Sequence, residues 1–266
     1  PTQLLTVVGQ DPAGAHLLGA LRDCGVDTGG CLAVAGVNSG TYTAVLDDSG
    51  EMVLALAHMD VCAQQTPEWL RQCAAQRAAA RLVVADLNLP AESVAQLLQD
   101  AQTSAAPLVI VAVSEPKMAN LPADLSGLNL LILNVGELHA RVGRNLNTEA
   151  DIAAACREVH AQGVRRIIVT RGAQGVLYSE YSEYSDDHDG KDNGGSLSHI
   201  PAPAVTVRDV TGAGDSFSAA VCWSLYHAPD DLGLAARRGV ALSALTVQSE
   251  QSVLPDLHAD LLESVD

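Results

Sequence analysis

The chain has 266 residues, of which 48% are hydrophobic, 18% charged and only 3% aromatic, and its formal net charge is −17. Such an acidic chain does not attract nucleic-acid phosphates over its surface, so we expect no nucleic-acid partner. No apolar run is long enough to span a bilayer, and the six cysteines form no CxxC pair or zinc-type spacing. We therefore predict a cytoplasmic protein with no membrane contact and reduced thiols.

The first third of the chain predicts a strand, a helix and a hairpin. An apolar strand is expected at 4–8 and a helix near 15–24. Two strands, 41–46 and 52–57, flank a turn rich in Asp and Gly, which is typical of a β-hairpin. The hairpin region is expected to extend over about 32–60.

From Thr66-Pro67, which predicts a helix start, strands and helices alternate. The expected strands are 81–86, 108–113, 130–134, 166–170 and 176–178, and the expected helices are 91–104, 149–162, 215–227 and 232–245. This alternation favours an α/β fold with a parallel sheet and helices on both faces. Residues 179–198 are almost without apolar side chains and predict a flexible insertion in a single domain that spans 1–266.

Three polar or glycine-rich clusters fall at or after predicted strand ends, where open parallel sheets collect their ligands. The clusters are Asn134 with Glu137, 170–175 and 209–215. Asn134 and Glu137 alone could be an ordinary helix start, and Arg171 could either touch a phosphate or be a solvated surface charge.

The third cluster carries the most specific chemistry. Gly212, Ala213 and Gly214 let the backbone approach a ligand closely, and the following helix presents free N–H groups that suit a phosphoryl group. Asp215 lies in the first helical turn, where a carboxylate could accept a proton from an attacking hydroxyl. Alternatively, Asp215 only caps the helix and the glycines form a tight turn.

The longer string Asp209-Val210-Thr211-Gly212-Ala213-Gly214-Asp215-Ser216-Phe217 resembles a signature of the ribokinase-like (PfkB) carbohydrate and nucleoside kinases. Asn134-Val135-Gly136-Glu137 is similar to that family's NxxE motif, and 170–175 to its TxGxxG segment. The resemblance implies a three-layer α/β/α sandwich with a mainly parallel central sheet and a small β-lid, which is here the hairpin region, about 32–60. The family's usual first strand, which carries a substrate-binding Asp, has no counterpart in this sequence.

The resemblance also implies a role for each matched residue, with ATP and Mg²⁺ as cofactors and K⁺ as a possible third. Asp215 would be the catalytic base, with Gly212, Ala213 and Gly214 as the anion hole. Residues implied to bind the nucleotide are Asn134, Thr170, Gly172, Gly175 and Thr211. Glu137 would hold magnesium, and Asp209 would hold a monovalent cation.

Within the family, the hairpin region is most similar to that of pseudouridine kinases, on Gly40–Asp47, Ala57–Val61 and Leu245–Glu250. Candidate substrate contacts are Thr41, Tyr42, Asp86 and Asn88. The implied reaction is phosphorylation of a small ribosyl compound, and the lid suggests a homodimer. Two alternatives stay open: another PfkB sugar or nucleoside kinase, or a nucleotide-binding relative with little activity.

Overall fold

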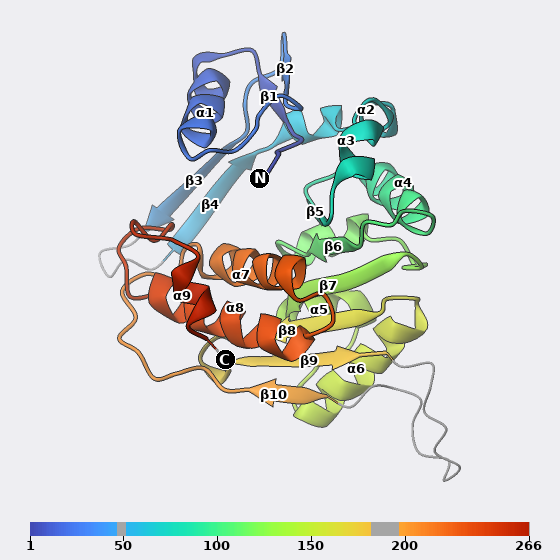
Figure 1. Ribbon diagram of the computed structural model, residues 1–266, viewed down its shortest axis with the longest axis vertical. Helices are drawn as coiled ribbons and strands as arrows, with labels where there is room; N and C mark the ends of the chain where they lie inside the picture. Colours follow the sequence, from blue (N-terminus) through green and yellow to red (C-terminus); the bar gives the residue numbers. More distant parts are fainter. Residues whose placement is uncertain (47–51, 182–196, 266) are drawn as a thin grey trace. The chain divides into compact units, whose positions relative to one another are not determined.

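The computed structural model describes residues 1–46, 52–181 and 197–265. The chain divides into two compact units (Figure 1). The first unit comprises Pro1–Ala79 and Asn88–Leu97, and the second comprises Ala80–Leu87 and Leu98–Asp266.

The first unit begins with a small parallel pair of strands, β1 (Val7–Gly9) and β2 (Leu32–Val34). The helix α1 (Pro12–Asp23) starts three residues earlier than predicted, because Asp11 is its N-cap and accepts a hydrogen bond from Gly14 N at 2.7 Å. Strand β1 starts later than predicted, because Leu4 N bonds to Asp27 O in the chain that leads to it.

The predicted hairpin is present in the first unit. Its strands β3 (Thr41–Leu46) and β4 (Met52–His58) pair antiparallel, with an irregularity between Val45 and Leu46. The turn that we predicted between them lies outside the described residues. The β2 residues, which we had included in the lid, pair with β1 instead. The unit continues through η1 (Asp60–Gln64), α2 (Pro67–Gln72) and α3 (Ala74–Ala79).

The second unit is built on a six-stranded sheet with the order β10-β9-β8-β7-β6-β5. Strands β5 to β8 are parallel, whereas β9 and β10 are antiparallel to their neighbours. The strands are β5 (Val83–Asp86), β6 (Leu108–Val111), β7 (Leu128–Asn134), β8 (Arg166–Thr170), β9 (Val176–Glu180) and β10 (Ser198–Ile200). The prediction of a mainly parallel α/β sheet is confirmed.

Helices cover both faces of this sheet, which explains the continuous apolar runs of its strands. Leu130, Ile132 and Ile168 pack with residues of α7 and α8 on one face. The alternate side chains Leu131 and Ile167 are also fully buried. The helices are α4 (Ala91–Ala101), α5 (Val135–Val142), α6 (Glu149–Ala161), α7 (Ala213–His227), α8 (Leu232–Thr246) and α9 (Asp260–Glu263), with short turns η2 (Glu115–Asn120) and η3 (Gly172–Gln174).

The predicted flexible insertion, 179–198, overlaps the sheet at both ends. Ser179 and Glu180 belong to β9, where they pair with Ile167 and Arg166 of β8, and Ser198 belongs to β10, where it pairs with Tyr178. Residues 182–196 of that prediction lie outside the described residues. Among the helices that the structure describes, none is both long and apolar enough to cross a membrane.

Candidate active site

Polar residues gather at the carboxyl-terminal edge of the parallel strands. Asn134 ends β7 and Thr170 ends β8, and the two are register partners across the neighbouring strands. Asp86 ends β5, which runs in the same direction, so its carboxylate belongs to the same edge. The sheet therefore brings together three of the residues that the sequence singled out.

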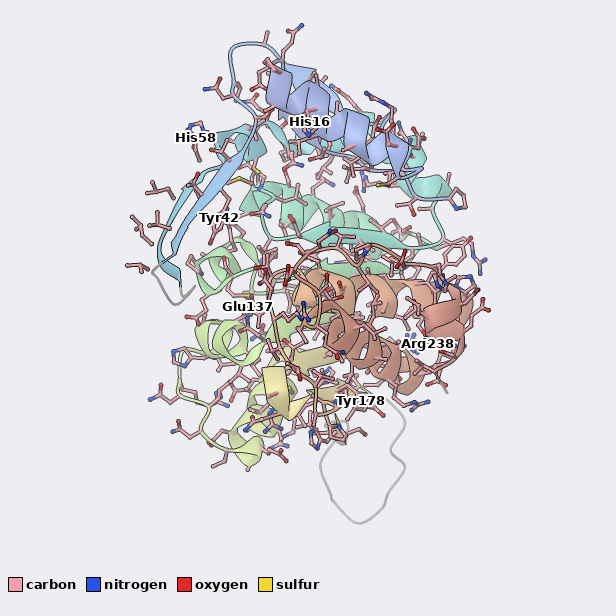
Figure 2. All side chains as sticks on the ribbon, turned by 90° about the vertical axis from the view of Figure 1, so that its left-hand side faces the viewer. His16, Tyr42, His58, Glu137, Tyr178 and Arg238 are labelled. Atoms are coloured by element: carbon pink, nitrogen blue, oxygen red, sulfur yellow. The ribbon has the colours of Figure 1, made fainter. Side chains whose placement is uncertain are left out.

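Asn134 and Glu137 form a reciprocal capping box at the start of α5. The Asn134 side chain accepts a hydrogen bond from Glu137 N at 2.9 Å, and the Glu137 carboxylate accepts one from Asn134 N at 2.7 Å. The helix-start interpretation is thus confirmed as local structure. The capping box uses one carboxylate oxygen of Glu137 and leaves the other for another role, although Glu137 is only 4% exposed (labelled in Figure 2).

A second carboxylate, Glu115, lies next to the start of α5 and was not assigned a role from the sequence. Its Cδ lies 3.0 Å from where a Cβ would stand on Gly136, so only a glycine there lets Glu115 approach the first turn of α5. Burial and the charge of Glu115 raise the pKa of Glu137, although the hydrogen bond from Asn134 N opposes this. Two carboxylates this close create a site that favours a cation.

The backbone that carries Glu115 is strained. Val113 has φ of 72°, and Ser114 N bonds to Ala112 O at 2.9 Å, which makes a tight three-residue turn. A β-branched residue rarely adopts this conformation. The turn ends β6 early and directs Ser114 and Glu115 toward α5, which the sequence did not reveal.

The glycine-rich turn before α7 is fixed by backbone contacts. Gly212, the N-cap residue, has φ of 81°, and a Cβ there would stand 3.0 Å from Ser252 Cα. Asp209 accepts a hydrogen bond from Thr211 N at 2.8 Å, which lowers the pKa of its carboxyl group. Asp209 N also bonds to Val247 O at 3.3 Å. Position 212 therefore requires glycine.

The direction of α7 places its first turn at the same end of the sheet as Asn134. Leu225, near the other end of α7, lines a hollow together with Leu128 and Arg166, which are the first residues of β7 and β8. A helix of 15 residues is about 22 Å long. Its start, with Gly214 and the exposed Asp215, therefore lies toward the carboxyl ends of the strands.

The predicted glycine-rich segment after Thr170 is also fixed by close contacts with neighbouring backbone. Gly175 has φ of 83°, and a Cβ on it would stand 2.6 Å from Ala202 N, so this glycine is required where the chain turns from β8 to β9. Gly172 has φ of 55° and open space around it. Arg171 forms an ion pair with Glu149 at 2.6 Å, so its charge is paired within the protein in this structure.

The remaining substrate candidates belong to the first unit. Thr41 and Tyr42 begin β3, and Tyr42 is 62% exposed. Asn88 follows β5 and has a polar contact of its own. Their role as substrate contacts stays a prediction.

Together, the parallel sheet, the edge formed by Asn134 and Thr170, and the glycine turn before α7 define an α/β protein whose polar and glycine-rich segments lie at the carboxyl ends of its parallel strands. The chain belongs to the pfkB family of carbohydrate kinases, whose match covers residues 1–259.

Known relatives agree with this assignment. The chain is 33% identical over 223 residues to pseudouridine kinase of Escherichia coli strain K12, a match that covers 83% of this chain and 66% of that protein. A carbohydrate kinase from Agrobacterium tumefaciens is 27% identical, with a TM-score of 0.78 over 99% of this chain and 79% of that one. Ribokinase from Thermotoga maritima has the same fold, with a TM-score of 0.75 at 18% identity over 98% of this chain and 80% of that one. The chain spans about two thirds of the length of two curated relatives that it matches, the pseudouridine kinase and an uncharacterized sugar kinase of Escherichia coli.

Alanine substitutions at the two outer glycines of the turn should separate backbone strain from function. Gly212→Ala should destabilise the fold by at least about 2 kcal/mol, because the positive φ and the Ser252 backbone both oppose a Cβ. Gly214→Ala should change stability by no more than about 0.5 kcal/mol, since a Cβ there meets nothing within 4 Å. Urea unfolding measures both, and equal stability of the two variants would contradict this account.

Proposed function

We propose that the protein is an ATP-dependent phosphotransferase that acts on the hydroxymethyl group of a ribosyl compound, with pseudouridine as the acceptor and pseudouridine 5′-phosphate as the product. The observation that carries the proposal is the turn from Gly212 to Asp215, which opens a helix at the same end of the sheet as Asn134 and Thr170. Family membership supports the reaction class.

The first turn of α7 has the two groups that the reaction requires of the protein. The exposed carboxylate of Asp215 would accept the proton of the attacking hydroxyl, whose oxygen then bonds to the γ-phosphorus of ATP while the bond to the β,γ-bridging oxygen breaks. The N–H groups that begin a helix have no intrahelical partner, and the space around Gly214 is open, although Ala213 N donates to Val210 O at 3.2 Å. They would stabilise the negative charge on the phosphoryl oxygens.

The cation requirement is proposed from two further features. Glu137 and Glu115 supply hard oxygen ligands, which fit Mg²⁺, and the ion would neutralise charge on the nucleotide phosphates. Thr170, Gly172 and Gly175 would line the nucleotide. Asp209 keeps a low pKa and is the group proposed for a monovalent cation such as K⁺.

The choice of pseudouridine rests on similarity to the Escherichia coli enzyme and on the hairpin stretches Gly40–Asp47 and Ala57–Val61. Thr41, Tyr42, Asp86 and Asn88 are the proposed acceptor contacts. Another sugar or nucleoside is the alternative acceptor. A protein that binds nucleotide with little turnover is the alternative of a different class.

An acceptor panel with one variant tests the reaction and its base. ADP release should depend on the acceptor and be fastest with pseudouridine among ribose, fructose, adenosine and pseudouridine. Asp215→Asn should lower kcat by about 100- to 10,000-fold, because it removes the proton acceptor, while ATP affinity stays near wild type.

Asp260→Asn is the matched control, since it changes an exposed first-turn aspartate of α9 and should leave kcat unchanged. Full activity of Asp215→Asn would refute the base assignment. Calorimetric ATP binding without ADP release from any acceptor would favour the nucleotide-binding alternative.

The carboxylate pair predicts how stability depends on pH and on magnesium. The folded state raises the pKa of Glu137, so it binds a proton more tightly than the unfolded chain does. In metal-free buffer this contribution is therefore present at low pH and is lost as the pH rises through the folded pKa, above the ordinary value near 4.5. Mg²⁺ should restore stability at pH 7.5, because its charge would offset the cost of ionising Glu137 in this buried place.

Thermal unfolding of three proteins checks this expectation. Glu115→Gln should melt at a higher temperature than wild type in metal-free buffer at pH 7.5, because it removes the like charge, and it should gain less from Mg²⁺. Glu263→Gln, an exposed change on α9, should behave as wild type. The same Mg²⁺ response in all three proteins would show that the pair does not hold the ion.

We further propose that the hairpin pairs two copies of the chain. Val45, Leu54 and Leu56 lie on one face of the ribbon by register and are 45%, 51% and 59% exposed. Exposed apolar side chains on one face of a hairpin are typical of a surface that a second protein chain buries. Sedimentation velocity should show a dimer that Leu54→Asp converts to monomer, and an unchanged distribution would reject this contact.

A further inference from the structure

A hollow of about 470 Å³ opens at the amino-terminal end of the same sheet. It is lined by Leu82 and Pro107, which precede β5 and β6, and by Leu128 and Arg166, which begin β7 and β8. All lining residues belong to the second unit. Arg166 and Thr170 are the two ends of β8, so four residue steps, or about 13 Å, separate the hollow from the candidate active site.

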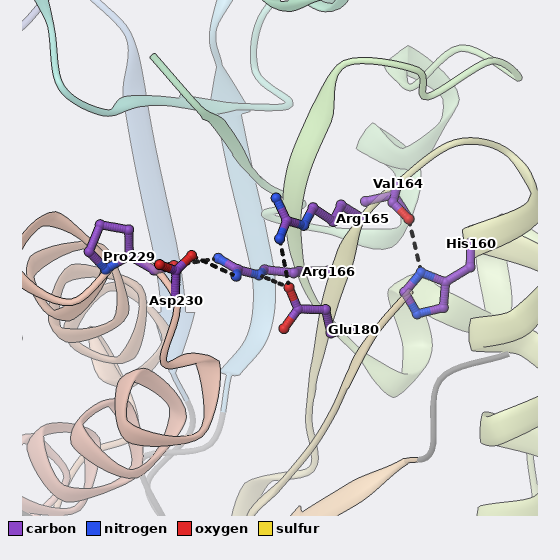
Figure 3. A network of polar contacts seen from close by, with 7 residues as sticks. All are labelled: His160, Val164, Arg165, Arg166, Glu180, Pro229 and Asp230. Carbon is purple, nitrogen blue, oxygen red and sulfur yellow. Dashed lines mark hydrogen bonds and ion pairs between the residues drawn. The ribbon is translucent and has the colours of Figure 1, made fainter. Parts of the chain in front are cut away.

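Arg166 is the central charged group of the hollow, and its side chain is only 4% exposed. Its Nε donates to Glu180 at 2.8 Å, and its Nη1 donates to the carbonyl of Pro229 at 2.6 Å (Figure 3). Its Nη2 faces Asp230 at 4.0 Å, which is beyond hydrogen-bond distance. A buried guanidinium that keeps free donors is a strong site for a further acceptor.

The groups around Arg166 leave room for an incoming negative charge. Asp230 is 98% exposed, and an exposed ion pair at this distance contributes little, so the carboxylate can leave at low cost. Arg165 is 57% exposed and contacts Glu180 at 3.3 Å.

We propose that this hollow binds a small organic anion whose oxyanion head, a carboxylate or a phosphate, takes the place of Asp230 at Arg166 Nη2. The planar guanidinium matches two oxygens of such a head, and Arg165 adds a second positive charge. Leu82, Leu128 and Leu225 supply an apolar wall for a short carbon body. The hollow would thus be a second ligand site, separate from the nucleotide and the acceptor.

Calorimetry on the full chain tests the proposal with sodium butyrate and inorganic phosphate as probes. A saturating non-hydrolysable ATP analogue and Mg²⁺ are present, so that the turn at Gly212 already faces a γ-phosphate and added phosphate does not report on it. Asp230→Asn should tighten binding by about two- to fivefold, because it removes the competing carboxylate. Arg165→Gln should weaken it by about three- to tenfold. Both side chains are exposed, so both variants should fold.

Asp23→Asn, an exposed change of equal charge on α1, is the control and should leave the affinity as in wild type. Binding of butyrate alone identifies a carboxylate head, and binding of phosphate alone identifies a phosphate head; either result supports the site. The proposal is overturned if neither probe binds to wild type or Asp230→Asn, or if the affinity does not rise in Asp230→Asn.

Discussion

The register of β7 against β8 is the constraint on which the candidate site depends. Both strands are buried on both faces, so a shift of one residue would move every apolar side chain to the wrong side. Asn134 and Thr170 end their strands level with each other because Leu130 to Leu133 pair with Arg166 to Val169. The hydrophobic core therefore sets the positions of the polar residues that follow it.

A second constraint comes from the opposite end of the sequence. Only glycine fits at position 212, because a Cβ there would meet the backbone of Ser252. Asp209 N also donates a hydrogen bond to Val247 O, which holds the turn against the same segment. The turn that begins α7 is thus shaped by the segment that follows α8. Substitutions in 247–252 that touch no ligand should act on the turn through these backbone contacts, as misplacement by about 1 Å can slow catalysis roughly 100-fold.

The sequence predicted most of the second unit because its strands carry continuous apolar runs and its helices carry strong start signals. The pair Asn134 and Glu137, which the sequence offered as a possible helix start, is an example, and β8 was predicted at its observed bounds. The start of α1 was predicted too late, because Asp11 is its N-cap and Pro12 its first residue. Strand β9 was predicted too short, because its last residues are polar and are defined by pairing with β10 and β8.

Glu115 was missed for a different reason. Its approach to α5 depends on a positive φ at Val113, which residue preferences argue against, and on the absence of a side chain at Gly136. No local pattern shows that these two features meet. Arg171 is a similar case: its neighbours allowed either a phosphate contact or a surface charge, and only the fold brings Glu149 to it.

Helix polarity explains why the two ends of the sheet suit different chemistry. At the carboxyl ends of the strands, α5 and α7 present their amino termini, whose partial positive charge favours phosphate and carboxylate groups. The hollow at the other end is lined by Ala101, Gly163 and Pro229, which lie at or just beyond the carboxyl termini of α4, α6 and α7.

Those termini carry partial negative charge, which stabilises Arg165 and Arg166 but repels a free anion. An anion in the hollow would therefore depend on the two guanidinium groups for nearly all of its binding energy. This dependence makes the hollow selective for an oxyanion that fits the Arg166 donors over anions in general. Any such ligand would act on the candidate active site through β7, β8 and α7, which have residues at both places.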